Sequence, residues 1–165
     1  MCGTCGCNES PKRPTVPRMT SHHITLETSL LAANATVAEA NRAYFLAHSI
    51  LVINLVSGPG AGKTRLLEAT ARHCHQHPPL LQVIEGDQQT DNDARRVREA
   101  GAIAHQINTG HLCHLEAFHI QQALAAQPPA DNSLLVIENV GNLVCPASFD
   151  LGEQLRIVMI STTEG

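Results

Sequence analysis

Short apolar runs alternate with amphipathic segments along most of the chain. The runs are rich in Val, Ile and Leu and end at Gly or polar residues, which is typical of strands buried in a parallel sheet. The pattern predicts strands at 51–56, 80–84, 102–107 and 156–161, and a further strand that begins with residues 134–136. Apolar residues three or four positions apart predict helices over 26–48, 64–77, 93–100 and 115–126. The alternation predicts an α/β fold with a mostly parallel sheet flanked by helices.

The first predicted strand runs directly into a turn of small residues, Gly58, Pro59, Gly60, Ala61, Gly62, Lys63 and Thr64. Such residues let backbone N–H groups surround phosphate oxygens, and the N-terminus of the following helix adds partial positive charge. In turns of this kind the Lys reaches the terminal phosphates, and the Thr hydroxyl binds Mg²⁺. The strict motif has Gly where this chain has Ser57, a departure that we expect the turn to tolerate. The turn predicts a nucleoside-triphosphate site.

Acidic residues follow the second and fourth strands, at the sheet edge where open α/β folds bind ligands. Asp87 is placed to hold Mg²⁺, directly or through water. Glu138 takes the position of the second Mg²⁺- or water-positioning carboxylate of P-loop proteins, and Gly141 is placed to donate its N–H to the terminal phosphate. Hydrolysis would rely on electrostatic positioning by Lys63, with Glu138 or Asp93 directing the attacking water.

Charge and composition exclude several classes of function. A net charge of −4 and 2% aromatic residues leave too few basic and stacking side chains for nucleic-acid binding. No apolar run approaches the ~20 residues of a membrane span, and the N-terminus lacks the apolar core of a secretory signal. These features predict a cytoplasmic protein with neither nucleic acid nor membrane as a partner. Six Cys and ten His then point to metal rather than disulfides.

Three cysteines, Cys2, Cys5 and Cys7, lie at the N-terminus of the chain. Intervening Gly residues free the backbone to bring the three sulfurs onto one ion, and removal of Met1 would add the α-amine of Cys2. Thiolates and an amine suit Ni(II) in a square plane or Zn(II) in a tetrahedron; free thiols or a redox pair are the alternatives. The Pro-containing segment 8–20 predicts a linker, so residues 1–20 are expected to be a flexible tail before a nucleotide-binding domain at 21–165.

A second group of soft ligands follows the third and fourth strands. Cys113 and His114 form a thiolate–imidazole pair suited to Zn(II) or Ni(II). A tight site needs a further ligand, from this chain or from a second subunit. Cys145 lies four residues after Gly141, so metal affinity is expected to depend on nucleotide state. A buried Cys beside a capping His is the alternative interpretation.

Five stretches resemble the HypB family, the nickel-incorporation GTPases that mature nickel–iron hydrogenase. They are CGTCGC at 2–7, NLVSGPGAGKT at 54–64, VIEGDQQTDNDA at 83–94, INTGHLCHLEA at 107–117 and IENVGNLVCPASFDLGE at 137–153. The resemblance implies a P-loop fold of the SIMIBI type, in which GTP joins two subunits across their nucleotide faces. It implies slow Mg²⁺-dependent GTP hydrolysis coupled to Ni(II) transfer to the hydrogenase large subunit, with a zinc/nickel accessory protein as maturation partner.

The resemblance also assigns roles by position. The family's phosphate and Mg²⁺ positions fall on Lys63, Thr64, Asp87 and Glu138. Its tight nickel motif falls on Cys2, Cys5 and Cys7, its weaker metal site on Cys113 and His114, and its switch cysteine on Cys145.

The chain departs from the family in several ways. His111-Leu112 replaces smaller residues, the His-rich storage tract of some members is absent, and so is the Asn-Lys-x-Asp motif that reads guanine. The fold is therefore expected to be incomplete at its C-terminus. A truncated metal-binding protein without effective GTPase activity and an ATP-using P-loop enzyme remain alternatives to the GTP-dependent metallochaperone.

Overall fold

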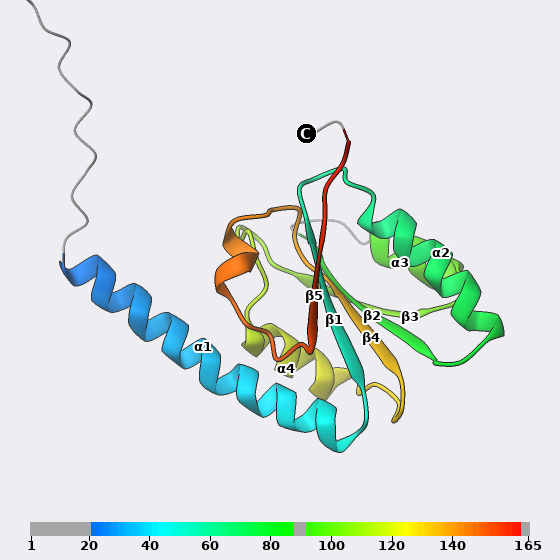
Figure 1. Cartoon of the computed structure of the whole chain (residues 1–165), viewed down its shortest axis with the longest axis horizontal. Coiled ribbons are helices and arrows are strands. Elements are labelled where there is room, and N and C mark those ends of the chain that lie inside the picture. The colour runs from blue at the N-terminus through cyan, green and yellow to red at the C-terminus, as the bar shows by residue number, and fades with distance from the viewer. Residues whose placement is uncertain (1–20, 88–91, 163–165) are drawn as a thin grey trace, which may run out of the picture.

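The computed structural model describes residues 21–87 and 92–162, and the side chains from 28 to 86 and from 92 to 162 (Figure 1). Helices and strands alternate along the described chain. They are α1 (Ser21–Ala47), β1 (Leu51–Ser57), α2 (Lys63–Gln76), β2 (Leu81–Asp87), α3 (Asn92–Glu99), β3 (Ile103–Asn108), α4 (Ala117–Ala126), β4 (Leu134–Glu138), the 3₁₀ turn η1 (Cys145–Ser148) and β5 (Leu155–Met159).

The five strands form one parallel sheet in the order β3-β2-β4-β1-β5. α-Helices connect the successive strands from β1 to β4, as is usual between parallel strands, whereas β4 connects to β5 through η1. The predicted α/β fold with a parallel sheet is confirmed. Residue ranges differ by a few positions: α1 begins at Ser21, and α4 begins at Ala117 because Glu116 occupies its N-cap. The pattern did not predict η1, which is a single short turn.

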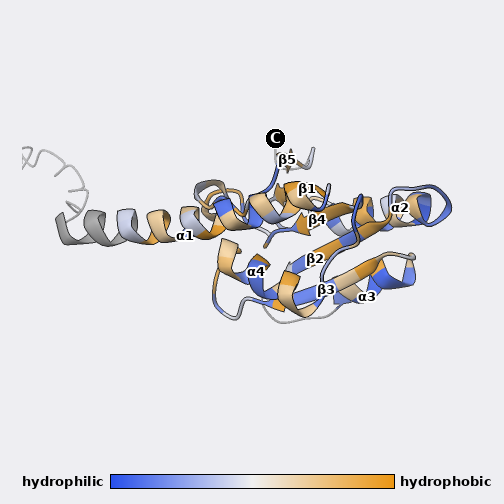
Figure 2. Ribbon diagram, turned by 90° about the horizontal axis from the view of Figure 1, so that it is seen from below, coloured by the Kyte–Doolittle hydropathy of each residue, from blue (hydrophilic) through white to orange (hydrophobic). Residues whose placement is uncertain are grey.

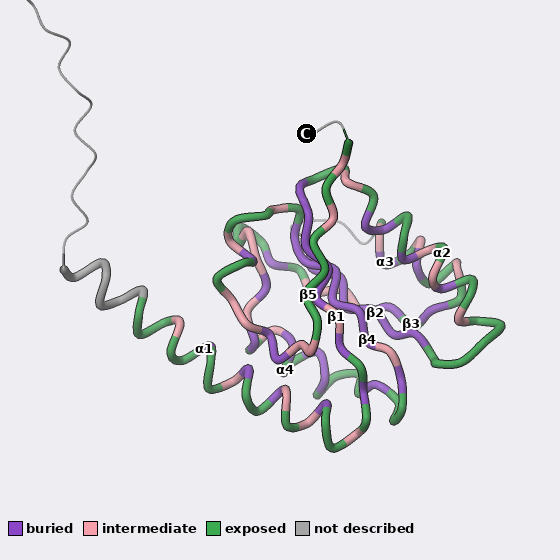
Figure 3. The backbone as a smooth tube through the Cα atoms, viewed as in Figure 1, coloured by how far each residue is buried: buried purple, intermediate pink, exposed green. Residues whose placement is uncertain are grey.

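A separate hydrophobic cluster covers each face of the sheet, because alternate strand residues point to opposite sides. The cluster under α1 and α4 includes Phe45, Val52, Ile84, Ile120 and Ile137. The cluster under α2 and α3 includes Leu55, Leu67, Val83, Val97 and Val136. Figure 2 shows hydrophobic colour concentrated in the sheet, and Figure 3 shows that the central strands are largely buried. The helices packed on both faces thus hold the strands, and with them the carboxyl ends of the strands, in fixed positions.

Two features lie at the margins of this arrangement. β5 forms one edge of the sheet, and its apolar residues Leu155, Ile157 and Val158 are exposed. The N-terminal half of α1 extends beyond the body of the molecule (Figure 1). Within the described residues, none of the helices combines the length and hydropathy needed to cross a membrane.

Candidate nucleotide site and metal centre

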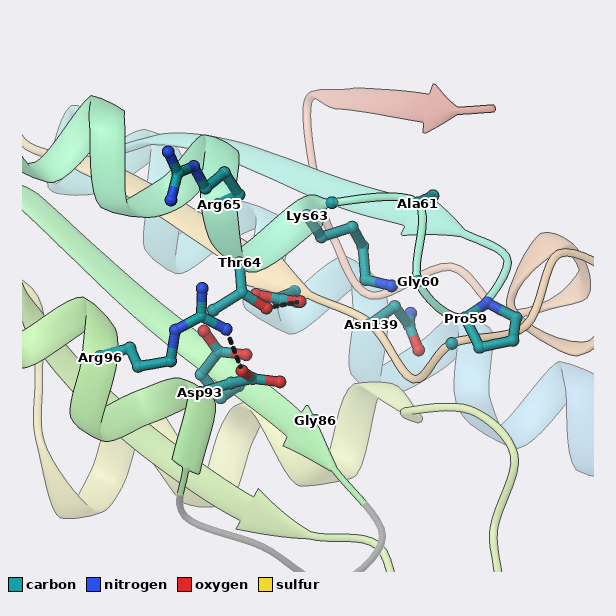
Figure 4. A pocket seen from close by; sticks show the side chains of 14 residues that line it. Pro59, Gly60, Ala61, Lys63, Thr64, Arg65, Gly86, Asp93, Arg96 and Asn139 are labelled. Atoms are coloured by element: carbon teal, nitrogen blue, oxygen red, sulfur yellow. Dashed lines mark hydrogen bonds and ion pairs between the residues drawn. The ribbon is translucent and has the colours of Figure 1, made fainter. Parts of the chain in front are cut away.

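The turn between β1 and α2 lines a cavity of about 420 Å³ (Figure 4). Gly60 and Gly62 have φ angles of 77° and 96°, in the left-handed region that favours glycine. An added Cβ would meet no atom within 4 Å at either position, so backbone conformation rather than space requires these glycines. The cavity walls come from the turn and from the ends of β2 and β4 and the start of α3; they include Pro59, Gly60, Ala61, Gly62, Lys63, Thr64, Glu85, Asp93, Glu138 and Gly141.

Ser57 lies at the base of the turn, as the last residue of β1. Its hydroxyl accepts a hydrogen bond from Lys63 Nζ at 2.8 Å and donates one to the carbonyl of Gly58 at 2.6 Å. Ser57 does not have a positive φ angle. A Ser at this position therefore fits the turn without backbone strain and holds the Lys63 ammonium group beside the cavity.

Two buried glutamates lie side by side beneath the cavity. Glu85 of β2 and Glu138 of β4 are partners in the strand register, and they are 2% and 5% exposed. The Thr64 hydroxyl donates a hydrogen bond to Glu138 Oε1 at 3.0 Å. Sequence reasoning did not assign Glu85, although a carboxylate within an apolar strand that leads to the ligand-binding edge was a usable signal.

The two carboxyl groups cannot both be ionised at little cost. Burial and the nearby charge of Glu138 raise the pKa of Glu85 to about 10. Burial also raises the pKa of Glu138, although Glu85, Lys63 and Thr64 oppose that rise. At neutral pH the carboxyl group of Glu85 is therefore protonated in the nucleotide-free chain.

The donor set fits a hard cation such as Mg²⁺. Glu85 Oε1 and Glu138 Oε2 are buried and have no hydrogen-bond partner among the described residues, and buried polar atoms are normally satisfied. With the Thr64 hydroxyl they offer the oxygen ligands that Mg²⁺ prefers. Asp87 ends β2 beside Asn108 of β3, but its side chain lies outside the described part.

Asp93 and Gly141 face the same cavity from two other elements. Asp93, in the first turn of α3, accepts a hydrogen bond from Arg96 Nη1 at 3.0 Å (Figure 4). Arg96 Nε also donates one to Glu68 at 2.9 Å. Gly141 lies so near the turn that an added Cβ would be 3.1 Å from Pro59 Cα. The loop after β4 therefore packs directly against the phosphate-binding turn.

Cys113, His114 and Cys145 lie together in the structure, although they belong to two different loops. One potential ligand atom from each side chain lies within 4.8 Å of those of the other two. Cys113 Sγ is 3.7 Å from His114 Nδ1, and all three residues are half-buried. Two thiolates and an imidazole are a ligand set for Ni(II) or Zn(II). The fold thus brings the pair after β3 and the cysteine after β4 within reach of one ion.

Two further residues orient the His114 ring, and neither was assigned from the sequence. Phe149 stacks on it with ring centroids 3.9 Å apart and planes at 23°. Glu116 Oε1 is 3.6 Å from His114 Nε2, and metal-bound imidazoles commonly have a carboxylate beside their second nitrogen. This geometry turns Nδ1 toward Cys113 and Nε2 toward Glu116.

Protonation of these groups bears on metal uptake. A hydrogen bond with Cys145, together with burial, raises the pKa of the Cys113 thiol. Burial lowers the pKa of His114, against the opposing effect of Glu116. The imidazole is thus neutral and ready to bind at pH 7, whereas Cys113 must release a proton when a metal binds. The predicted ligands Cys2, Cys5 and Cys7 lie outside the described residues.

Comparisons with known proteins agree with this architecture. The family described as CobW/HypB/UreG, nucleotide-binding domain, matches residues 51–160. The chain is 49% identical over 158 residues to the hydrogenase maturation factor HypB of Azotobacter chroococcum, covering 95% of this chain and 52% of that protein. It is 53% identical over 142 residues to HypB of Escherichia coli, covering 86% and 49%. The chain therefore spans about half the length of these relatives.

Solved structures give the same result. A crystal structure of HypB from Helicobacter pylori in complex with nickel has a TM-score of 0.71 and 41% identity, covering 81% of this chain and 62% of that one. HypB from Archaeoglobus fulgidus has a TM-score of 0.72 and 41% identity, covering 81% and 64%. The resemblance found in the sequence motifs is confirmed, and the chain belongs to the CobW/HypB/UreG family of nucleotide-binding domains.

Proposed function

We propose that this chain is part of a GTP-dependent nickel metallochaperone that helps to insert Ni(II) into nickel–iron hydrogenase. The observation that carries the proposal is the path from Glu138 to Cys145. This loop begins at the cavity, passes Pro59 at Gly141 and ends at the metal centre. A change in nucleotide state at one end can thus alter ligand geometry at the other. The names of the relatives, and the nickel bound to the Helicobacter pylori protein, agree with this role.

In the nucleotide site, backbone N–H groups of Gly60–Thr64 and the Lys63 ammonium group would hold the phosphates. Thr64, Asp87 and Glu138, with Glu85 beneath them, would hold Mg²⁺. The ion would supply positive charge to the phosphoryl group during transfer. Glu138 or Asp93 would position the attacking water, since each has one oxygen in a hydrogen bond, with Thr64 and Arg96 respectively. Hydrolysis by this arrangement would be slow.

Nickel is the cargo of the second site. Cys113, Cys145 and His114 Nδ1 would provide three ligands, and a square plane or tetrahedron leaves one position for water or a second subunit. A nucleotide-dependent homodimer would supply that ligand, and the accessory protein and the hydrogenase large subunit would exchange metal at this face. We assign residues 1–20 as a metal-binding tail and residues 21–165 as the nucleotide-binding domain of a cytoplasmic protein.

The central test is whether a nucleotide changes nickel affinity. In a chain with Cys2, Cys5 and Cys7 changed to Ser, GTP with Mg²⁺ is expected to shift the Ni(II) dissociation constant about tenfold, a coupling of ~1.4 kcal/mol. Competition titration with a metal chelator measures the shift. The Cys145→Ser control should remove most of the dependence on nucleotide. Equal Ni(II) affinity with and without GTP would contradict the coupling. If ATP displaced GTP from the chain as well as GTP itself does, the ATP-using alternative would be favoured.

The tail makes a separate prediction. Cys2→Ala removes one thiolate from the proposed N-terminal site, so the Ni(II) affinity of that site should fall by at least about tenfold. The measurement uses the full chain with Cys113 and Cys145 changed to Ser, so that the Ni(II) binding that is measured comes from the N-terminal tail. An unchanged affinity would remove Cys2 from the site.

A further inference from the structure

Helix α1 buries two asparagines on the side that packs against the start of α4 and against residues 150–151. Asn34 is 9% exposed and Asn41 is 2% exposed. Burying an amide is unfavourable unless its donors and acceptor are hydrogen-bonded. Neither residue lines the nucleotide cavity.

The Asn34 amide joins the two loops that carry the metal ligands. Its Oδ1 accepts a hydrogen bond from the backbone N–H of Ala117 at 2.8 Å, and its Nδ2 donates to the carbonyl of Asp150 at 2.7 Å. Ala117 lies three residues after His114, and Asp150 lies five residues after Cys145. One buried side chain therefore bonds both halves of the centre.

Asn41 repeats this bridge two turns further along α1. Its Nδ2 donates to the carbonyls of Ala117 at 2.9 Å and Leu151 at 3.1 Å. Beside it, the guanidinium of Arg42 contacts both carboxylate oxygens of Asp150, at 2.9 and 2.7 Å. The start of α4 and the segment after η1 are thus held against the same helix face.

The segment after η1, residues 149–152, is in close contact with α1, and this contact depends on a glycine. Gly152 has a φ angle of 93°, and an added Cβ would lie 2.7 Å from the carbonyl oxygen of Ala38 and 2.9 Å from the backbone nitrogen of Arg42. The segment therefore packs directly on the α1 backbone. Phe149, at its beginning, stacks on His114. Movement of the segment away from α1 would shift both Cys145 and the His114 ring.

We propose that Asn34 and Asn41 are positioning residues of the metal centre. They hold the Cys113–His114 loop and the Cys145 loop at the separation at which one ion can bind all three side chains. Neither asparagine contacts the metal itself. The inference rests on the metal centre assigned under the proposed function, and it adds that α1 determines the geometry of that centre.

The test compares metal binding in two variants with a matched control on the same helix. Asn34→Ala removes both bonds, whereas Asn34→Asp keeps the acceptor for Ala117 and loses the donor to Asp150, so it preserves the start of α4 if the alanine variant does not fold. Thr36→Ala is the control, because its hydroxyl is exposed and bonds only within α1. All three are made in the full chain with Cys2, Cys5 and Cys7 changed to Ser.

Both Asn34 variants are expected to bind Ni(II) about tenfold more weakly than the parent and to show a shifted or weakened thiolate-to-metal absorption band at saturation. Thr36→Ala should match the parent in both measurements. A purely structural role would lower the melting temperature but leave the saturated spectrum unchanged, which would overturn the inference while the centre remains. Absence of a Ni(II)–thiolate band in the parent would overturn the metal centre itself, and the inference with it.

Discussion

Lys63→Ala is expected to lower the affinity of the chain for GTP about 100-fold. Lys63 Nζ is buried at the base of the cavity and held by Ser57, so its positive charge acts on phosphate oxygens with little screening by water. Loss of a charge-assisted hydrogen bond of this kind costs about 2–3 kcal/mol, and each 1.4 kcal/mol is tenfold in affinity. Calorimetric titration of wild type and variant with GTP and Mg²⁺ measures the difference.

Lys63→Arg is the matched control, because it keeps the charge but cannot reproduce the compact ammonium group. It should lose less affinity than the alanine variant. Nickel binding by the nucleotide-free chain should be the same in all three proteins, since Lys63 belongs to the cavity and not to the metal centre. If Lys63→Ala bound GTP as tightly as wild type, the turn would not be the phosphate site.

The strands and the phosphate-binding turn could be predicted because their signals are local. An apolar run such as 51–56 identifies a buried strand without knowledge of its neighbours. The requirement for Gly at positions 60 and 62 follows from the backbone of the turn itself. The same reasoning placed Cys113 and Cys145 on loops at one edge of the sheet. It could not show that the two sulfur atoms lie close enough to bind one ion, because their separation depends on the tertiary fold of the two loops.

The residues that sequence reasoning missed are those whose roles depend on tertiary neighbours. Glu85 is a carboxylate within an apolar strand, and only its pairing with Glu138 and its burial show that it lies beneath the cavity. Asn34 and Asn41 look like the polar face of a surface helix. Their burial results from the segment at Asp150–Gly152 returning to α1. Hydrophobic periodicity carries no information about that return.

The raised pKa of Glu85 has a consequence for stability that can be measured. An isolated Glu has an ordinary pKa of 4.5, whereas the folded protein raises that of Glu85 to about 10. Folding therefore takes up a proton between these two values. The free energy of unfolding should fall as pH rises through this range, because the unfolded chain binds fewer protons than the native one.

Glu85→Gln is expected to stabilise the nucleotide-free protein at neutral pH. The Gln amide is neutral and carries an N–H that can face Glu138, without the need to bind a proton. Keeping a group of pKa 4.5 protonated at pH 7 costs about 3 kcal/mol, so the variant should gain stability of that order. This gain corresponds to a melting temperature roughly 6–12 °C higher at pH 7 and nearly unchanged at pH 4.5.

Thermal unfolding of both proteins from pH 4.5 to 9 tests this expectation, in the presence of EDTA and without nucleotide, because a cation in the cavity would favour the ionised carboxylates. The difference in melting temperature should increase with pH. Glu138→Gln is the control: it removes the charge that repels ionised Glu85, but it also replaces one carboxylate oxygen by an NH₂ group and makes the hydrogen bond from Thr64 a neutral one, so it should stabilise less. A variant Glu85→Gln that is less stable than wild type at every pH would mean that Glu85 is ionised in the fold and bound to a positive partner.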